Sequence, residues 1–223
     1  FDHFSSLAAE AIVVIAPVDS LAEAVASQGA SVPVVAVSGG RAFGRGVSVV
    51  HADQRGGARA LVEHLISLGH RDIACVAGPQ EWFEARERVA GWREAMDDAG
   101  LPKREPLVGS WEARWGYVAG QNLVEDGLPD AVMCANDEVA VGLLRAFAEA
   151  RVSVPGDVSV AGFDDVPMAA YAGPGLTTVR QDFADLGRCA LEAVSHALDG
   201  ETVDTYVRPT RLVVRGSTGV CAR

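Results

Sequence analysis

Lysine is almost absent from this sequence, and that absence excludes several kinds of chemistry. Among 19 basic residues only Lys103 is a lysine, and it lies in the polar turn 101–105, so amine-based catalysis would rest on one solvated side chain. The net charge is −11, and the arginines are scattered rather than gathered in a stripe. Because gripping a phosphate backbone requires a basic patch, we do not expect this chain to contact DNA through its main surface.

The familiar motifs of catalytic and metal sites are also missing. The sequence contains neither Gly-x-Ser-x-Gly nor His-Glu-x-x-His, and its five histidines do not cluster at metal-ligand spacing. Segment 38–46 (SGGRAFGRG) is not a phosphate-binding loop, because the Gly-Lys-Ser/Thr ending is absent and no helix follows. We interpret it as a mobile surface loop. We therefore predict that the chain is not an enzyme and binds neither a cofactor nor a metal ion.

No apolar run is long enough to span a bilayer, and no charged-then-apolar leader begins the sequence. Because the first residue is Phe1 rather than Met, we expect a longer chain and give the missing leader little weight. The four cysteines form no Cys-x-x-Cys motif. Cys75 and Cys134 lie in apolar runs and Cys189 in a helical pattern, so we expect buried free thiols in a reducing compartment.

Short apolar runs alternate with amphipathic helical windows along nearly the whole chain. Several runs are continuous in Val, Ile and Ala, which indicates strands buried on both faces, as in a parallel sheet covered by helices. The expected strands are 12–16, 34–37, 47–50, 73–77, 106–108, 131–134, 158–161, 177–179 and 212–214. Five helical windows lie among them, and they end at Gly69, Gly100, Gly127, the region after Phe147, and Asp199-Gly200. This alternation predicts a doubly wound α/β fold.

Polar and aromatic side chains follow several of these strands. If the strands are parallel, their carboxyl ends open onto one crevice, where ligands bind. A carboxylate accepts hydrogen bonds from hydroxyls, Asn donates and accepts, Arg donates in a fixed fork, and a tryptophan face packs on a sugar ring. The set therefore suits a polyhydroxylated ligand. Its members are Trp82, Arg88, Trp111, Asn136 and Asp164.

Each of these residues also has a structural interpretation. Asn136 or Asp137 could cap the following helix, with about even odds. We favour Asp165 as the cap of the next turn. Arg88 could lie on the surface of its helix, paired with Glu84. Among the aromatics, the loop residue Trp82 is a ligand wall or packs under a lid, whereas Trp111, just past a strand, is the strongest candidate. Trp92 stands at core spacing.

At these residues the sequence resembles the lactose-repressor (LacI/GalR) family of bacterial transcription regulators. The resemblance covers nearly the whole length and is carried by ordered motifs at matching spacing. They are 63–71 (EHLISLGHR), 77–79 (AGP), 88–92 (RVAGW), 135–138 (ANDE), 154–165 (VPGDVSVAGFDD) and 176–181 (LTTVRQ), and the end 212–218 (LVVRGST) also fits.

The resemblance implies a periplasmic-binding-protein-like (type I) core of two doubly wound parallel-sheet lobes, with a small effector bound between them. The N-terminal lobe would comprise 1–71 with 181–207 and be incomplete at its start, and the C-terminal lobe 72–180 with 208–223. The three crossovers would fall near Arg71, Gln181 and Arg208. The family's DNA-binding helix-turn-helix and hinge helix are absent from this sequence.

Site residues follow from the resemblance position by position. Arg88, Asn136 and Asp164 match polar effector contacts, and Trp111 and Phe183 match positions that place an aromatic against the ligand. Glu84 and Gln181 match positions that vary with the effector. The implied protein is a cytoplasmic homodimer that binds a sugar-like effector, without membrane contact, and binds operator DNA through a domain outside this sequence. The alternatives are a secreted solute-binding protein of a sugar transporter and, with least support, an enzyme.

Overall fold

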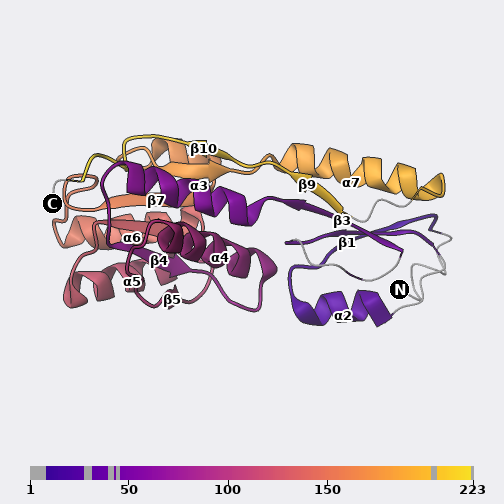
Figure 1. Ribbon diagram of the computed structural model, residues 1–223, viewed down its shortest axis with the longest axis horizontal. Coiled ribbons are helices and arrows are strands. Elements are labelled where there is room, and N and C mark those ends of the chain that lie inside the picture. The colour runs from indigo at the N-terminus through magenta and orange to yellow at the C-terminus, as the bar shows by residue number, and fades with distance from the viewer. Residues whose placement is uncertain (1–8, 28–31, 40–42, 44–45, 202–204, 222–223) are drawn as a thin grey trace. The chain divides into compact units, whose positions relative to one another are not determined.

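The chain divides by its internal contacts into two compact units in the computed structural model, whose course Figure 1 traces. The structure describes residues 9–27, 32–39, 43, 46–201 and 205–221. Unit 1 comprises residues 1–53, 81–84 and 182–209, and unit 2 comprises 54–80, 85–181 and 210–223. The segment before residue 9 and most of the glycine-rich segment 38–46 lie outside the described residues.

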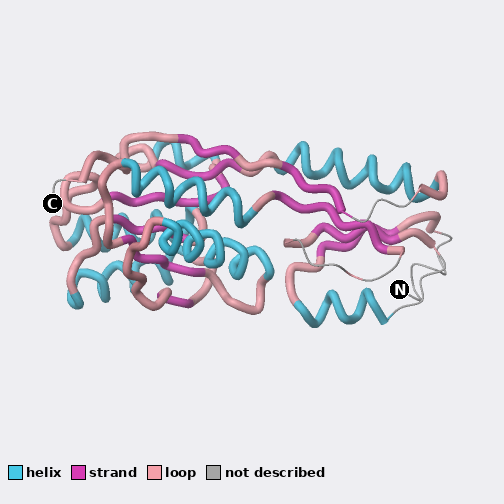
Figure 2. Tube along the Cα trace, viewed as in Figure 1, coloured by secondary structure: helices cyan, strands magenta, loops and turns pink. Residues whose placement is uncertain are grey.

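Unit 1 is built on a parallel sheet with helices on both faces. Its strand order is β1 (Ile12–Ile15), β2 (Val34–Val37), β3 (Val47–Ala52) and β9 (Thr205–Arg208). Alternate residues point to opposite faces of a strand. Val34 and Ala36 accordingly join the apolar cluster of α2 (Asp19–Ser27), whereas Val35 joins that of α7 (Phe183–Leu198). Figure 2 shows the two helices and the strands.

Unit 2 carries the larger sheet, in the order β10-β8-β7-β6-β4-β5. Only β10 is antiparallel to its neighbour, and the remaining pairs are parallel. The strands are β4 (Ile73–Ala77), β5 (Leu107–Val108), β6 (Ala131–Cys134), β7 (Ser159–Asp164), β8 (Thr177–Arg180) and β10 (Arg211–Val213). The helices are α3 (Gln54–Ser67), α4 (Phe83–Asp98), α5 (Ala113–Asp126) and α6 (Asp137–Glu149), with a 3-10 helix, η1, at Pro167–Tyr171.

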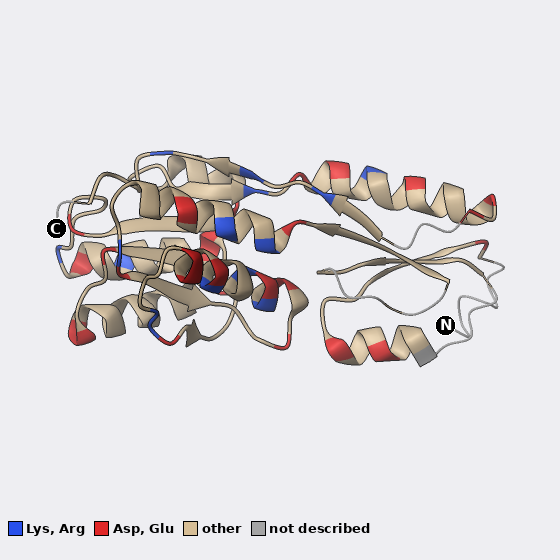
Figure 3. Ribbon diagram, viewed as in Figure 1, with Lys and Arg blue, Asp and Glu red and all other residues tan. Residues whose placement is uncertain are grey.

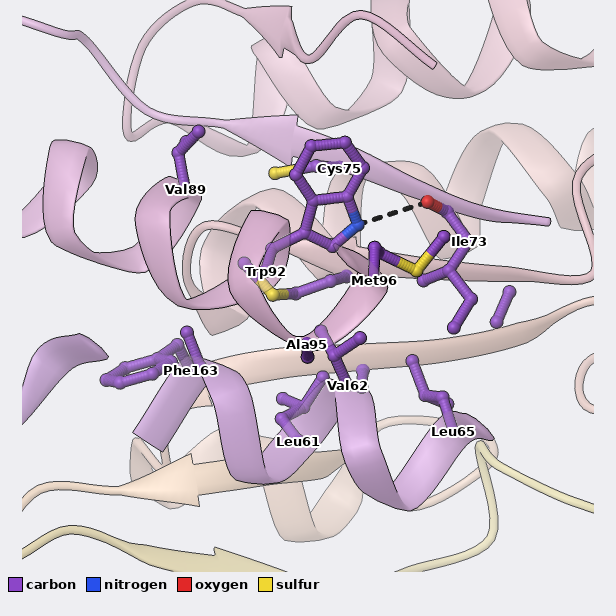
Figure 4. Close-up of a cluster of buried hydrophobic side chains, with 14 of the residues drawn as sticks. Leu61, Val62, Leu65, Ile73, Cys75, Val89, Trp92, Ala95, Met96 and Phe163 are labelled. Carbon is purple, nitrogen blue, oxygen red and sulfur yellow. Dashed lines mark hydrogen bonds between the residues drawn. The ribbon is translucent and has the colours of Figure 1, made fainter. Parts of the chain in front are cut away.

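Two apolar layers cover the two faces of this sheet. Helices α3 and α4 supply one layer, in which Trp92 is fully buried and its Nε1 donates to the carbonyl of Ile73 at 3.1 Å (Figure 4). Helices α5 and α6 supply the other, which includes Leu143 and Phe147. Each such side chain contributes about 1.5–3 kcal/mol through burial. The two layers make unit 2 doubly wound, as the sequence predicts.

The chain first enters unit 2 at Gln54, rather than near Arg71 as expected from the resemblance. The reason is the packing of α3. Its apolar stripe, which includes Leu61 and Leu65, joins the buried cluster of Trp92 and Phe163 in unit 2. The other two passages between the units lie at 181/182 and 209/210, and residues 81–84 make a short return to unit 1.

The expected strands and helices all appear, with shifts of a few residues at their ends. Three elements were not predicted from the sequence: α2, η1 and β9. β9 is an edge strand of the described sheet whose residues alternate between exposed and half-buried, so it lacks the continuous apolar run that marks the buried strands. Cys75, Cys134 and Cys189 are buried free thiols, as predicted.

Candidate ligand-binding site

The carboxyl ends of the parallel strands in unit 2 bring several predicted residues to one edge of the sheet. β7 ends at Asp164, β8 is followed by Gln181, β6 is followed by Asn136, and Trp111 comes after β5. Arg88 joins them from α4. This is the edge at which ligands bind in open α/β sheets.

Arg88 is the central donor of this group. Only 4% of the residue is exposed. Its Nε donates to Oε1 of Gln54 at 2.8 Å, its Nη1 to the carbonyl of Ala135 at 2.5 Å, and its Nη2 to Oδ1 of Asp164 at 3.0 Å. The alternative of a surface position for Arg88 is therefore wrong.

Two glutamines complete a closed ring of hydrogen bonds with Arg88 and Asp164. Nε2 of Gln54 donates to Oε1 of Gln181 at 2.7 Å, and Nε2 of Gln181 donates to Oδ1 of Asp164 at 2.6 Å. Gln54 was not predicted as a site residue, because a glutamine at the start of a helix carries no distinctive signal in the sequence.

Asp164 offers an acceptor that the ring does not use. Its side chain is 19% exposed, and its Oδ1 accepts from both Arg88 and Gln181. Among the described residues, no side chain or backbone group donates to its Oδ2. The backbone at Asp164 has φ 103° and at Asp165 φ 57°, a region that L-residues rarely adopt and that costs of order 1–3 kcal/mol per residue. Backbone strain of this kind clusters at functional sites.

Asp165 plays a different part from its neighbour, and the prediction that it caps the next turn is wrong. Its carboxylate accepts from Nη2 of Arg215 at 2.6 Å and from Nε of Arg180 at 2.5 Å, and its side chain is 4% exposed. Burial alone would raise the pKa of Asp165, but the hydrogen bonds from the two arginines outweigh it and lower that pKa. The N-cap position of η1 is occupied by Val166, and no side chain caps this turn.

Asn136 is the N-cap of α6, so the capping interpretation is confirmed for this residue. Its Oδ1 accepts from the N–H of Val139 at 2.8 Å, and its Nδ2 donates to the carbonyl of Trp111 at 3.1 Å. The guanidinium carbon of Arg88 lies 5.4 Å from the ring centroid of Trp111 and 3.9 Å from that of Phe163, within the range of cation–π attraction. Trp111 and Asn136 thus both belong to the polar edge that holds Arg88.

Asp137 lies buried behind this edge. Its Oδ1 accepts from the hydroxyl of Thr178 at 2.6 Å, and its Oδ2 accepts from the N–H of Val166 at 2.8 Å. Burial is the largest effect on this carboxyl, and it raises the pKa of Asp137 to about 6 despite both hydrogen bonds. Asp137 ties α6 to β8 and to the start of η1.

The remaining predicted contacts belong to unit 1. Trp82 forms an isolated antiparallel bridge with Val18, and Glu84 follows at the start of α4. Phe183 is the first residue of α7, capped by Asp182, and is 56% exposed. The structure therefore brings Arg88, Asn136, Asp164, Trp111 and Gln181 together within unit 2, and it describes the other three residues within unit 1.

The described residues offer no group of three or more His, Cys, Asp or Glu side chains that could hold a metal ion. No helix within the described ranges is long and apolar enough to cross a membrane. Figure 3 shows arginines interspersed with acidic residues along α3 and α4. Arg59, for example, pairs with both Glu63 and Asp98. The site is thus organised by side-chain hydrogen bonds and one ion pair.

Comparisons with known proteins place this geometry in a family. A family model described as a periplasmic binding protein-like domain matches residues 62–218. A structure of the lac repressor dimer bound to operator and the anti-inducer ONPF matches with a TM-score of 0.86 at 30% identity, covering 98% of this chain and 77% of that chain. The chain belongs to the LacI family. The resemblance noted from its motifs is therefore confirmed.

Two further relatives extend this LacI-family assignment. The chain is 35% identical over 164 residues to the lactose operon repressor of Escherichia coli (strain K12), which covers 73% of this chain and 46% of the repressor. The structure of a LacI family transcriptional regulator from Enterococcus faecium with bound ribose matches with a TM-score of 0.84 at 25% identity, covering 98% of this chain and 82% of that one. The chain spans about half the length of the curated relatives it matches.

Proposed function

We propose that this chain binds a small polyhydroxylated effector at the carboxyl edge of the unit 2 sheet. The observation that carries the proposal is the geometry of Asp164. Its Oδ1 is fixed by Arg88 and Gln181, while its Oδ2 is left as an acceptor on a partly exposed side chain. A carboxylate held in this way accepts from ligand hydroxyls without first having to be ordered.

The neighbouring side chains suit the same kind of ligand. Trp111 offers an indole face for the C–H face of a sugar ring. Asn136 already uses its Oδ1 and one N–H within the protein, which leaves its second N–H as a donor. Trp82, Glu84 and Phe183 remain proposed contacts from unit 1.

We further propose that effector binding regulates transcription. The relatives support this, since the matched proteins include repressors, a lac repressor dimer bound to operator and a regulator with bound ribose. In this proposal the protein is a cytoplasmic homodimer without enzymatic activity, and its operator contacts lie in a domain outside this chain. The same relatives favour a regulator over a secreted solute-binding protein.

A thermal-shift panel of pentoses, hexoses, disaccharides and nucleosides tests the binding proposal on the full-length protein. A ligand present at one hundred times its Kd adds about 2.7 kcal/mol to the free energy of unfolding, which raises the melting temperature measurably. We expect at least one sugar to do so, and Asp164→Asn to remove the shift.

The matched control is Asp157→Asn, because Asp157 is exposed and only accepts from the backbone of Ser153 within its own turn. This variant should keep the full sugar-induced shift. A sugar that stabilises wild type and Asp164→Asn equally would show that the ligand binds elsewhere. No shift from any member of the panel would count against a sugar effector.

A further inference from the structure

Gln54 lies at the first point where the chain passes from unit 1 to unit 2. It is the first residue of α3 and the first residue of unit 2, and only Asp53 separates it from the end of β3. Although it is polar, it is 5% exposed.

Gln181 occupies the matching position at the second passage. It is the last residue of unit 2 before Asp182, which caps α7 of unit 1. It follows β8 directly and is 8% exposed. The two glutamines are 127 residues apart in sequence, yet their side chains are joined by a hydrogen bond of 2.7 Å.

Both arms of the ring run from the donor Arg88 to the acceptor Asp164, and this fixes the chemistry required at residue 54. Arg88 can only donate, so residue 54 must accept from it, and residue 54 must also donate to Oε1 of Gln181. An amide side chain meets both demands. A glutamate would keep the first bond and lose the second, and a methionine would lose both.

We propose that Gln54 is a positioning residue that couples occupancy of the ligand site to the first passage between the units, as Gln181 does at the second. It holds the Arg88 guanidinium directly and the Asp164 carboxylate through Gln181. When a ligand hydroxyl binds Asp164, the change in hydrogen bonding is transmitted to both Gln54 and Gln181 through hydrogen bonds of 2.6–3.0 Å. The coupling part of this inference rests on the proposed function, whereas the positioning part does not.

The positioning part is tested without ligand, on full-length protein labelled with ¹⁵N-arginine. The side-chain Nε–H signal of Arg88 is assigned as the one lost in Arg88→Lys. Because this N–H is buried and bonded to Gln54, it should exchange slowly with solvent. Gln54→Glu should keep the signal and shift it, since the new acceptor is charged. Gln54→Met should speed its exchange at least tenfold, and unchanged exchange in Gln54→Met would overturn the proposal.

The coupling part is tested by hydrogen–deuterium exchange of two segments, residues 50–55 and 179–183, with D-ribose at saturation as the probe. In wild type, D-ribose should slow exchange in both segments. In Gln54→Glu, which keeps the bond from Arg88, it should still slow exchange in both segments. In Gln54→Met the effect on 50–55 should be lost even when the site is saturated. Residues 179–183 should stay protected through the bond of Gln181 to Asp164, and this difference separates coupling from weaker affinity.

The control is Gln121→Met, at an exposed glutamine on α5, which should behave as wild type in both measurements. Equal protection of residues 50–55 in wild type and Gln54→Met would overturn the coupling. If D-ribose leaves wild type itself unchanged, the proposed function fails for that sugar. The ligand-free exchange of Arg88 would still decide whether Gln54 positions it.

Discussion

Unit 2 contains two buried polar networks at opposite edges of one sheet, and they differ in kind. At the amino edge, the hydroxyl of Ser217 donates to the carbonyl of Val160 at 2.6 Å and accepts from the N–H of Thr177 at 2.8 Å. His64 and His70 hold the same C-terminal segment through Thr218 and Gly219. We call this the amino-edge network, and the ring of Arg88, Gln54, Gln181 and Asp164 the carboxyl-edge network.

The comparison teaches that buried polarity does not by itself mark a binding site. The amino-edge network joins hydroxyls and imidazoles to backbone groups and to one another, and it fastens the C-terminal segment to β7 and β8. The carboxyl-edge network contains an ion pair, a strained backbone at Asp164 and an acceptor oxygen that the ring leaves over. These three features, together with the strand direction, point to a ligand.

The largest effect is expected from Arg88→Met, which breaks the carboxyl-edge network. Removing one partner of a buried ion pair leaves the other charge uncompensated and costs about 3–5 kcal/mol. Because Asp164 is partly exposed, we expect a loss near 3 kcal/mol in urea unfolding, together with loss of any sugar-induced thermal shift. Arg145→Met removes only an exposed pair with Glu149 and should cost less than about 1 kcal/mol. Equal losses in both variants would contradict the account.

The third carboxyl at the carboxyl edge, after those of Asp164 and Asp165, belongs to Asp137, and its pH dependence tests whether it is structural. Its pKa is raised from 3.8 to about 6 in the folded state, so the folded protein holds the proton more tightly than the unfolded chain does. This contribution to the free energy of unfolding is therefore complete below pH 3.8 and is lost as the pH rises through 6, by about 3 kcal/mol.

The measurement is the difference in unfolding free energy between pH 4 and pH 7 for wild type and Asp137→Asn. The asparagine can still accept from Val166 and can donate to the hydroxyl of Thr178, which reverses its role. The variant should gain stability relative to wild type as the pH rises. The same pH dependence in both proteins would show that Asp137 does not titrate in this range.

Ser217→Ala is expected to break the amino-edge network without touching the ligand site. The substitution leaves the buried N–H of Thr177 without its acceptor, which costs about 1–3 kcal/mol. Chemical unfolding should report this loss, while the thermal shift produced by the effector stays the same size. A variant that folds normally but loses ligand affinity would show that the two edges are not independent.

The smallest effect is expected from Gly78→Ala. A Cβ at this position would meet the indole of Trp111 at 2.7 Å, so the ring must shift from its present position beside Arg88. We expect an affinity loss of about tenfold, or ~1.4 kcal/mol, by titration calorimetry. Gly187→Ala is the control, because a Cβ there meets nothing within 4 Å. A wild-type affinity for Gly78→Ala would remove Trp111 from the site.

Much of the fold could be predicted because its strands are buried on both faces. Continuous runs such as 34–37 and 131–134 carry that burial directly in their composition, and both appear with the expected bounds. β9 could not be predicted in this way, since an edge strand needs no such run. The first passage between the units was expected near Arg71 but lies at Gln54. The difference arises because the packing of α3 on α4 depends on contacts between residues distant in sequence.

The candidate site was predictable only in part, for a similar reason. Strand ends and motifs point to Arg88, Asp164 and Trp111, but they do not distinguish a cap from a ligand contact. Asn136 turns out to be a cap, and Asp165 an acceptor between two arginines. Gln54 could not be predicted from the sequence, because its contacts with Arg88 and Gln181 form only when β3, α4 and β8 come together in the fold.

The most direct test of the central claim is a crystal structure of the full-length protein with the sugar that most stabilises it. The account predicts a ligand hydroxyl within hydrogen-bonding distance of Oδ2 of Asp164, a sugar face against Trp111, and an amino-edge network that contacts no ligand. A sugar bound away from Asp164, with the ring of Arg88, Gln54 and Gln181 unengaged, would contradict it.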